Sequence, residues 1–149
     1  MLSSSRFIVA IHALSVLARF AGRGPVCSNQ VAQSVNTNPV VIRRLMSDLE
    51  KANLVTSAAG RTGGFSLARA ADRISLADIY RAVEDETIFR MHKTDPDSDC
   101  PIGAQICKVL AGPLHAAESA LAASLAGTSL KDISTRITSP AAVSVVQGV

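Results

Sequence analysis

The stretch NPVVIRRLMSDLEKANLVTSAAGRTGGFSLAR, residues 38–69, decides the fold because it joins an amphipathic helix to a turn-rich hairpin. Asn38 and Pro39 predict a helix start, since an Asn side chain accepts from free helix amides and proline at the first helical position loses no needed hydrogen bond. The core face, spaced by three and four residues, is Ile42, Leu45, Met46 and Leu49. We expect this helix to end near Asn53. Residues 54–57 and 65–68 then predict two strands around a turn-rich loop.

The residues before Asn38 predict two further helices. Apolar residues three or four apart indicate an amphipathic helix over residues 6–20, which the AGRGP run at 21–25 ends. Ser28 is the expected N-cap of a short helix over residues 30–35, and residues 36–38 form a turn. Two short helices joined by a tight turn and followed by a basic hairpin are the order of a winged helix-turn-helix.

The residues after the hairpin predict two more helices. Ser75 is expected to cap a helix that runs to Glu84, with its buried side chains at Leu76, Ile79, Tyr80 and Val83. From Ile102 a long helix follows, which Pro113 should kink or interrupt. We therefore expect a mainly α fold with a small β-hairpin wing, divided into a winged helix-turn-helix head (1–84), a linker or sensor loop (85–101), a dimerisation helix with a C-terminal element (102–137) and a flexible tail (138–149).

This order of elements predicts a protein that binds double-stranded DNA. In such heads the later helix enters the major groove, and the wing contacts phosphates or the minor groove. Arg43 and Arg44 lie about one turn inside the helix, within reach of guanine edges or backbone oxygens, and the free amides at its start suit a phosphate. The glycines beside Arg61 allow close approach to a sugar-phosphate chain. The candidate DNA-binding residues are Ser28, Asn38, Pro39, Val40, Arg43, Arg44, Arg61, Thr62, Gly63, Gly64 and Arg69.

The long helix predicts a homodimer. Its apolar stripe consists of Ile106, Leu110, Leu114, Ala117, Leu121 and Leu125. An isolated helix after an acidic linker has few partners in its own chain for such a stripe, so a second copy is the expected partner. The alternative is that the stripe folds back onto the first helix.

Composition limits the other classes of function. The net charge is +3 with a pI near 9.0, which permits a nucleic-acid partner, while an aromatic content of 3% argues against stacking platforms for single strands. The first 21 residues carry Arg6, His12 and Arg19 at helical intervals, which fits neither a signal peptide nor a membrane span, so we expect a cytoplasmic protein without a membrane partner. Phosphate-binding glycine motifs and zinc-ligand pairs are absent from the sequence, and we expect no enzyme. The alternatives are a winged-helix protein-interaction module and an enzyme with a Cys nucleophile.

The sequence resembles the Rrf2 family of bacterial regulators. The resemblance lies in NPVVIRRL at 38–45, LEKANLV at 49–55, GRTGGFSLAR at 60–69 and ISLADIYRAVE at 74–84, and it covers most of residues 1–137. It implies a homodimer whose long C-terminal helices cross, with two winged heads on a near-palindromic operator, acting as a repressor or an activator.

The cysteines bear on how such a regulator would sense a signal. Some family members hold an iron–sulfur cluster with three closely spaced cysteines after the head, but only Cys100 and Cys107 lie there, so we expect no cofactor and no metal. Cys100 precedes a helix start, which favours the thiolate, whereas Asp95, Asp97 and Asp99 disfavour it, so the net pKa shift stays open. Across two helical turns, Cys100 and Cys107 would lie about 10 Å apart, beyond the limit of about 7 Å for a disulfide. Both are candidates for redox sensing, whereas Cys27 is expected to be a packed residue.

Overall fold

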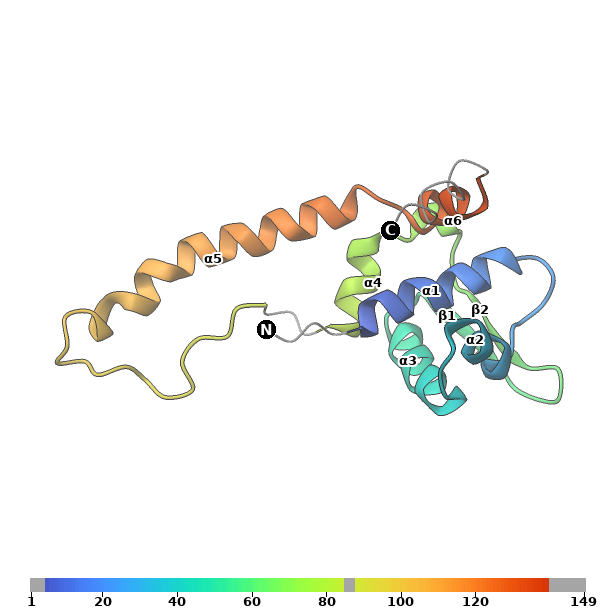
Figure 1. Ribbon diagram of the computed structural model, residues 1–149, viewed down its shortest axis with the longest axis horizontal. Coiled ribbons are helices and arrows are strands. Elements are labelled where there is room, and N and C mark those ends of the chain that lie inside the picture. Colours follow the sequence, from blue (N-terminus) through green and yellow to red (C-terminus); the bar gives the residue numbers. More distant parts are fainter. Residues whose placement is uncertain (1–4, 85–87, 140–149) are drawn as a thin grey trace, which may run out of the picture.

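Three successive helices begin the head of the protein. The computed structural model describes residues 5–84 and 88–139, and its first elements are α1 (Arg6–Arg19), α2 (Ser28–Val35) and α3 (Pro39–Lys51) (Figure 1). Asn36 ends α2 in the left-handed conformation, with φ of 60°. Asn38 then caps α3, because its side-chain oxygen accepts a hydrogen bond of 2.8 Å from the Val40 amide, as predicted.

An antiparallel hairpin forms the wing. Strands β1 (Val55–Ala58) and β2 (Gly64–Leu67) pair so that Val55 lies opposite Leu67 and Ala58 opposite Gly64. The residue before Cys27 extends this pairing, since the backbone of Val26 exchanges hydrogen bonds of 2.9 and 2.8 Å with that of Phe65. The wing is therefore attached to the segment that leads into α2.

Two short elements and a last helix close the other side of the head. After η1 (Ala71–Arg73), helix α4 (Leu76–Val83) begins with a capping box in which Ser75 and Asp78 bond each other's backbone amides. Helix α6 (Leu130–Thr138) has the same device in Ser129 and Asp132. Backbone hydrogen bonds from Leu76 to Thr128 (2.9 Å) and from Leu130 to Ile74 (2.8 Å) join the starts of α4 and α6.

The core lies between these elements and is apolar throughout. All four residues of the predicted α3 face are buried, at 0–3% exposure, together with Leu14 of α1 and Ile79 of α4. Leu130 of α6 is also fully buried, so α6 contributes to the core of the head. Among the described residues no polar or charged side chain is buried, so the contacts inside the core between these elements are hydrophobic.

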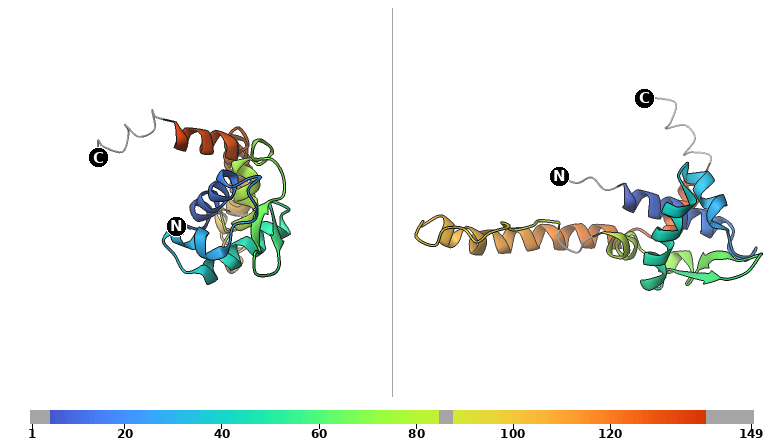
Figure 2. Two further views of the ribbon diagram at one scale, coloured as in Figure 1. Left: turned by 90° about the vertical axis from the view of Figure 1, so that its right-hand side faces the viewer. Right: turned by 90° about the horizontal axis from the view of Figure 1, so that it is seen from below.

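Helix α5 (Gly103–Ala126) projects from the head as an arm (Figures 1 and 2). It contacts α4 near the head and has no buried residue along its length. The alternative in which this helix folds back along α1 is therefore wrong. Pro113 was expected to kink or interrupt the helix, and the interruption is wrong, because the helix continues through Pro113. An exposed helix tolerates this proline because water can bond the carbonyl that it leaves without a donor.

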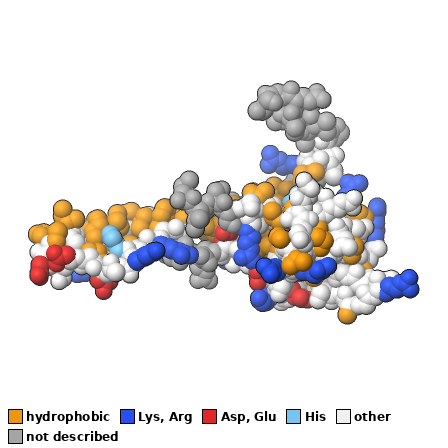
Figure 3. Space-filling model, turned by 60° about the horizontal axis from the view of Figure 1, so that its bottom comes forward, with side chains coloured by type: hydrophobic (Ala, Val, Ile, Leu, Met, Phe, Trp, Pro, Cys, Tyr) orange, Lys and Arg blue, Asp and Glu red, His pale blue; other side chains and the backbone are white. Residues whose placement is uncertain are grey.

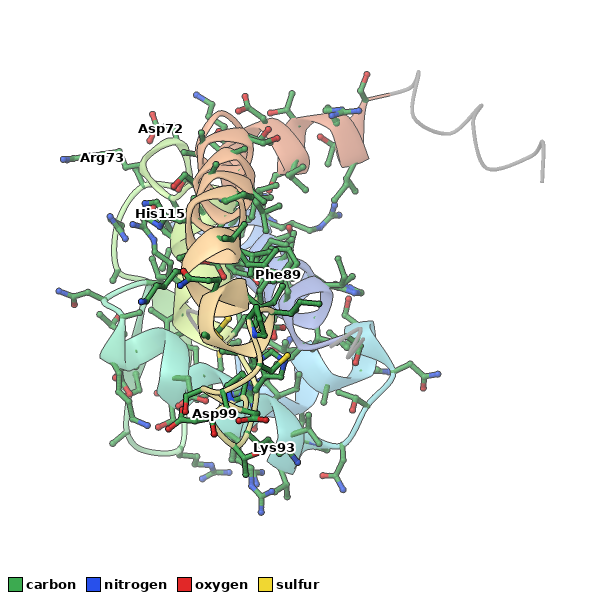
Figure 4. The ribbon with its side chains drawn as sticks, turned by 90° about the vertical axis from the view of Figure 1, so that its left-hand side faces the viewer. Asp72, Arg73, Phe89, Lys93, Asp99 and His115 are labelled. Atoms are coloured by element: carbon green, nitrogen blue, oxygen red, sulfur yellow. The ribbon has the colours of Figure 1, made fainter. Side chains whose placement is uncertain are left out.

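The loop before α5 runs outward along the arm, and α5 returns to the head (Figure 1). The carboxylate of Glu118 accepts hydrogen bonds from the backbone amides of Ile88 (3.0 Å) and Phe89 (3.3 Å), which ties the start of the loop to the middle of α5. Figure 4 shows Phe89 beside this helix and Lys93 and Asp99 farther along the loop.

Three details differ from the sequence expectations. Helix α2 begins at Ser28, so the cap position belongs to Cys27, whose side chain makes no capping hydrogen bond. On α4 the buried residues are Ala77, Ile79 and Val83, while Leu76 and Tyr80 are only half-buried; Tyr80 instead packs edge-on against the ring of Phe7, with 5.3 Å between centroids. Of the expected tail, Thr138 belongs to α6, and residues 140–149 lie outside the described part of the chain.

Candidate DNA-binding surface

The outward face of α3 carries exposed basic side chains. Arg43, Arg44 and Lys51 are exposed, and Val40 and Val41 are 45% and 49% exposed, whereas the opposite face of the helix lies in the core. Figure 1 shows α3 and the wing loop on the side of the head away from α6. Helix α3 therefore presents a row of side chains that can enter a groove.

The N-terminus of α3 is satisfied within the chain. Pro39 has no amide hydrogen, the Val40 amide bonds the Asn38 side chain, and the Val41 amide bonds the Asn38 carbonyl at 3.0 Å. The expectation of free amides that receive a phosphate is therefore wrong, and Asn38 and Pro39 serve the geometry of the helix. Contact with an anion at this end depends on side chains and on the helix dipole.

Arg43 is held in place by α2. Its Nε donates a hydrogen bond of 3.2 Å to the hydroxyl of Ser28, which leaves the terminal nitrogens of the guanidinium to extend outward. Ser28 thus positions an arginine where the sequence analysis expected a helix cap. A second contact between helices, 2.9 Å between His12 Nε2 and the Ser34 hydroxyl, joins α1 to α2.

The wing is fastened to α3 by a residue that the sequence analysis missed. The Glu50 carboxylate, near the end of α3, accepts hydrogen bonds from the Ser57 amide (3.0 Å) and from the Ser57 hydroxyl (2.6 Å) on β1. These bonds fix the direction of the wing relative to α3. The sequence holds no signal for this pair, because a glutamate at the end of a helix is ordinarily a solvated charge.

Arg61 and Thr62 lie exposed at the turn of the wing, between β1 and β2. The two glycines that follow them face the chain's own backbone. A Cβ on Gly63 would lie 2.2 Å from the Ala58 carbonyl oxygen, and one on Gly64 would lie 2.4 Å from that of Val26. The glycines therefore permit the wing to fold tightly, which presents Arg61 outward.

Arg69 has a different setting. It is exposed but lies beyond β2, with its guanidinium 3.9 Å from the Asp78 carboxylate of α4. Arg43 and Arg44 therefore lie on α3 and Arg61 lies on the wing, whereas Arg69 lies beside α4. Figure 3 shows basic side chains distributed over the head, including its outer end.

The candidate sensing cysteines lie at the far end of the arm. Cys100 is exposed, and hydrogen bonds from the Gly103 and Ile102 amides lower the pKa of its thiol. The shift of this pKa is therefore downward, which is the direction that the sequence left open. Cys107 is half-buried, with its sulfur 3.8 Å from His92 Nδ1. Cys27 is half-buried on the head, and its thiol donates to the Gln30 side chain at 3.5 Å.

Comparison with known proteins gives a consistent assignment. Residues 3–136 match the Rrf2 family, described as an iron-dependent transcriptional regulator. The chain is 41% identical over 131 residues to YwnA of Bacillus subtilis, named provisionally as an HTH-type transcriptional regulator; the match covers 87% of this chain and 95% of YwnA.

Solved structures agree with this match. One crystal structure, described provisionally as that of a DNA-binding protein, is 40% identical with a TM-score of 0.70 and covers 87% of this chain and 98% of its own. The structure of CymR, the global cysteine regulator of Bacillus subtilis, is 25% identical with a TM-score of 0.66, over 91% of this chain and 98% of CymR. This chain belongs to the Rrf2 family of transcriptional regulators.

Proposed function

We propose that this chain regulates transcription by binding a near-palindromic DNA operator as a homodimer. The observation that carries the proposal is the pairing of two basic elements on the head: the α3 face with Arg43 and Arg44, and a wing that Glu50 and Val26 hold in a fixed direction with Arg61 at its turn. A helix of this kind reads base edges while a wing contacts the backbone beside it. We propose action by binding rather than catalysis, in the cytoplasm.

A mobility-shift titration against genomic fragments, at several salt concentrations, tests DNA binding. We expect tight, salt-sensitive binding to a few fragments, weakened by about 1–3 kcal/mol when Arg43, Arg44 or Arg61 is changed to Ala. Arg73→Ala is the matched control, because Arg73 is exposed on η1 and points away from α3 (Figure 4). Failure of the wild-type protein to shift any fragment at low salt would contradict the proposal.

The free face of α5 supports a homodimer. Ile102, Val109 and Leu121 are 73%, 65% and 38% exposed, and with Leu110 and Ala117 they follow one side of the helix. Of the stripe predicted from sequence, Ile106, Leu114 and Leu125 are half-buried, so only part of it is free for a partner. By length and composition α5 could also cross a membrane, with a mean hydropathy of 1.2 in its most apolar window. We propose that a second copy of the chain, and not a membrane, covers the apolar side of α5, since Lys108, His115 and Glu118 give the helix a polar side.

The proposed two-fold dimer predicts the form of the operator. Two identical heads related by such an axis read the same half-site in opposite directions, which requires an inverted repeat. Occupancy of that repeat excludes other proteins from the same DNA, and we therefore propose repression as the outcome.

We propose that the thiol state of Cys100 and Cys107 modulates this binding. A peroxide would oxidise the Cys100 thiolate to sulfenic acid and release hydroxide, a reaction that exposure and a lowered pKa of the thiol both favour. This chain is also similar to a crystal structure of the oxidised form of Staphylococcus aureus CymR, with 25% identity and a TM-score of 0.62. In this chain we expect oxidation of Cys100 to change the position of the loop before α5.

The cysteines do not fit an iron–sulfur cluster, although the family description mentions iron. A cluster of this kind normally takes four thiolate ligands, with histidine as an occasional replacement. Cys27 lies on the head by α2, whereas Cys100 and Cys107 lie at the far end of α5 (Figure 1). Within residues 5–84 and 88–139, no three His, Cys, Asp or Glu side chains converge in a way that could hold a metal. We therefore propose that the chain works without a cluster.

A further inference from the structure

The outermost row of side chains on α3 begins with an apolar residue. Four exposed residues at helical spacing form this row, opposite the buried face of the helix: Val40, Arg44, Ser47 and Lys51. Val40 lies in the first turn, directly after Pro39. In helix-turn-helix heads the N-terminal residues of this helix are those that contact base edges. The end of α3 that meets the bases therefore presents a valine.

The two flanks of α3 are engaged inside the head, and Val40 lies between them. On one flank, Arg43 bonds α2 at 3.2 Å and Glu50 bonds β1 at 3.0 and 2.6 Å. On the other flank, Val41 lines a cleft between α1 and α3 together with Val9. Among the residues that the structure describes, Val40 belongs neither to the core nor to the apolar side chains that pack on it. Its side chain is therefore left for a partner outside the chain.

The helix itself gives no reason for a valine at this position. A β-branched residue forms helices less readily than alanine or a long polar residue does. The start of the helix is already set by the cap of Asn38 and by Pro39. A single exposed valine is common on a protein surface, but Val40 is 45% exposed and stands one turn before Arg44 on the face that enters the groove.

Val40 is also held stiffly. Its backbone amide is bonded to the side chain of Asn38 at 2.8 Å, and a valine in a helix has one strongly preferred rotamer. Its two methyl groups therefore keep a fixed direction and lose little freedom when they meet a partner. In the major groove the apolar group that distinguishes one base from the others is the C5-methyl group of thymine.

We propose that Val40 contacts the C5-methyl group of a thymine in each half of the operator, beside a guanine that Arg44 contacts. Four residues span about 6 Å along a helix and neighbouring base pairs lie about 3.4 Å apart, so the thymine and the guanine lie within about two base pairs of each other. The inference rests on the proposed DNA-binding function and adds the identity of a base that the protein reads.

Replacement of thymidine by deoxyuridine tests this contact, because it removes the methyl group and leaves the pairing with adenine intact. The probe is the fluorescent duplex that the full wild-type chain enriches most from a random library, with the thymines of its half-sites replaced one position at a time. Binding is measured by anisotropy. At one position the replacement in a single half-site should weaken wild-type binding by about fourfold, the effect of one buried methyl group.

Two valine variants assign the effect to a residue. Val40→Ala should bind the unmodified duplex more weakly than the wild type and should bind the deoxyuridine duplex equally well. Val41→Ala is the matched control, since it makes the same change at the next residue, which faces the α1 cleft, and it should keep the fourfold difference. Both variants should fold, because both side chains are exposed and alanine favours a helix.

The outcomes separate this inference from the proposed function. If the wild type binds every deoxyuridine duplex as tightly as the unmodified one, no thymine methyl is read and the inference is wrong, although the chain still binds DNA. If Val40→Ala keeps the wild-type difference, another side chain reads the methyl group and the inference is equally wrong. If the wild type enriches no duplex at all, the proposed function itself fails.

Discussion

At the scale of single residues, the wing depends on two positions where a Cβ atom would collide with the backbone. Gly63 and Gly64 follow Arg61, and the sequence suggested that they bring the backbone close to DNA. Their contacts show a different reason, because each lies against a carbonyl of the chain itself, Ala58 in one case and Val26 in the other. The function of Arg61 therefore depends on packing inside the wing.

Gly64→Ala should separate β2 from Val26 and weaken DNA binding. An added Cβ would lie 2.4 Å from the Val26 carbonyl oxygen, so the two backbone hydrogen bonds between Val26 and Phe65 must lengthen. We expect a loss of about 1–3 kcal/mol in the free energy of unfolding, measured by urea denaturation. Gly112→Ala is the control: it lies inside exposed α5 with nothing within 4 Å of the new Cβ, and it should stabilise the chain slightly. Equal stability of the Gly64 variant and the wild type would contradict this packing.

Cys100 should react as a thiolate at lower pH than an ordinary cysteine. The amides of Gly103 and Ile102 stabilise the charged form and lower the pKa of this thiol from its usual 9.0. The measurement is the rate of alkylation by iodoacetamide against pH, in a Cys27→Ser, Cys107→Ser double variant that retains only Cys100. A midpoint below 9.0 is expected, and a midpoint at or above that value would argue against activation at the start of α5.

At the scale of elements, the sequence predicted the helices that have both a local start signal and a periodic apolar face. Helix α3 has Asn38, Pro39 and a four-residue core face, and all of these are confirmed. Helix α6 was not predicted as part of the head, although Ser129 and Asp132 form its capping box, because only the fold reveals that Leu130 reaches the core beside α4. The pairs Glu50–Ser57 and Arg6–Asp48 each join two different elements, so no pattern within one element predicts them.

The capping box of α4 should make part of the stability depend on pH. Burial tends to raise the pKa of the Asp78 carboxyl, but hydrogen bonds from the Ser75 amide and hydroxyl and the charges of Arg69 and Arg81 outweigh it, and the pKa is lowered from 3.8. A lowered pKa means that the ionised group stabilises the fold above pH 3.8 and that this contribution is lost as the pH falls through the lower, folded value.

Asp78→Asn should therefore cost about 1 kcal/mol at neutral pH and show a smaller loss of stability on acidification than the wild type. Urea denaturation at a series of acid pH values measures both effects. Asp72→Asn provides the comparison, since Asp72 is an exposed residue of η1 outside any capping box, and it should follow the wild-type curve (Figure 4). If the free energy of unfolding falls equally on acidification in all three proteins, the capping box of α4 contributes nothing to the pH dependence.

At the scale of the whole molecule, the arm is the feature that a single chain does not explain. Helix α5 leaves the head with an apolar side uncovered, while its other side receives the loop through Glu118. Apolar area of this kind is costly in water, so a second arm is the natural cover for it.

Val109→Asp should convert the proposed dimer to a monomer without unfolding the head. Val109 is 65% exposed in one chain, so the new carboxylate is costly only where a partner covers it. We expect the dimer dissociation constant, measured by sedimentation equilibrium, to rise by at least about a hundredfold, since an unpaired charge in an apolar interface costs about 3–5 kcal/mol and each 1.4 kcal/mol is a factor of about ten. Ser119→Asp, on the polar side of α5, should remain dimeric. Dissociation of both variants, or of neither, would place the interface elsewhere.

Selection of duplexes from a random library by the wild-type protein tests the central claim most directly. If two α3 helices and two wings read DNA around a two-fold axis, the enriched sequences should share an inverted repeat, with half-sites about one helical turn, or a whole number of turns, apart. Enrichment of no motif, or of a single asymmetric site that the Arg43→Ala and Arg61→Ala variants bind equally well, would contradict it.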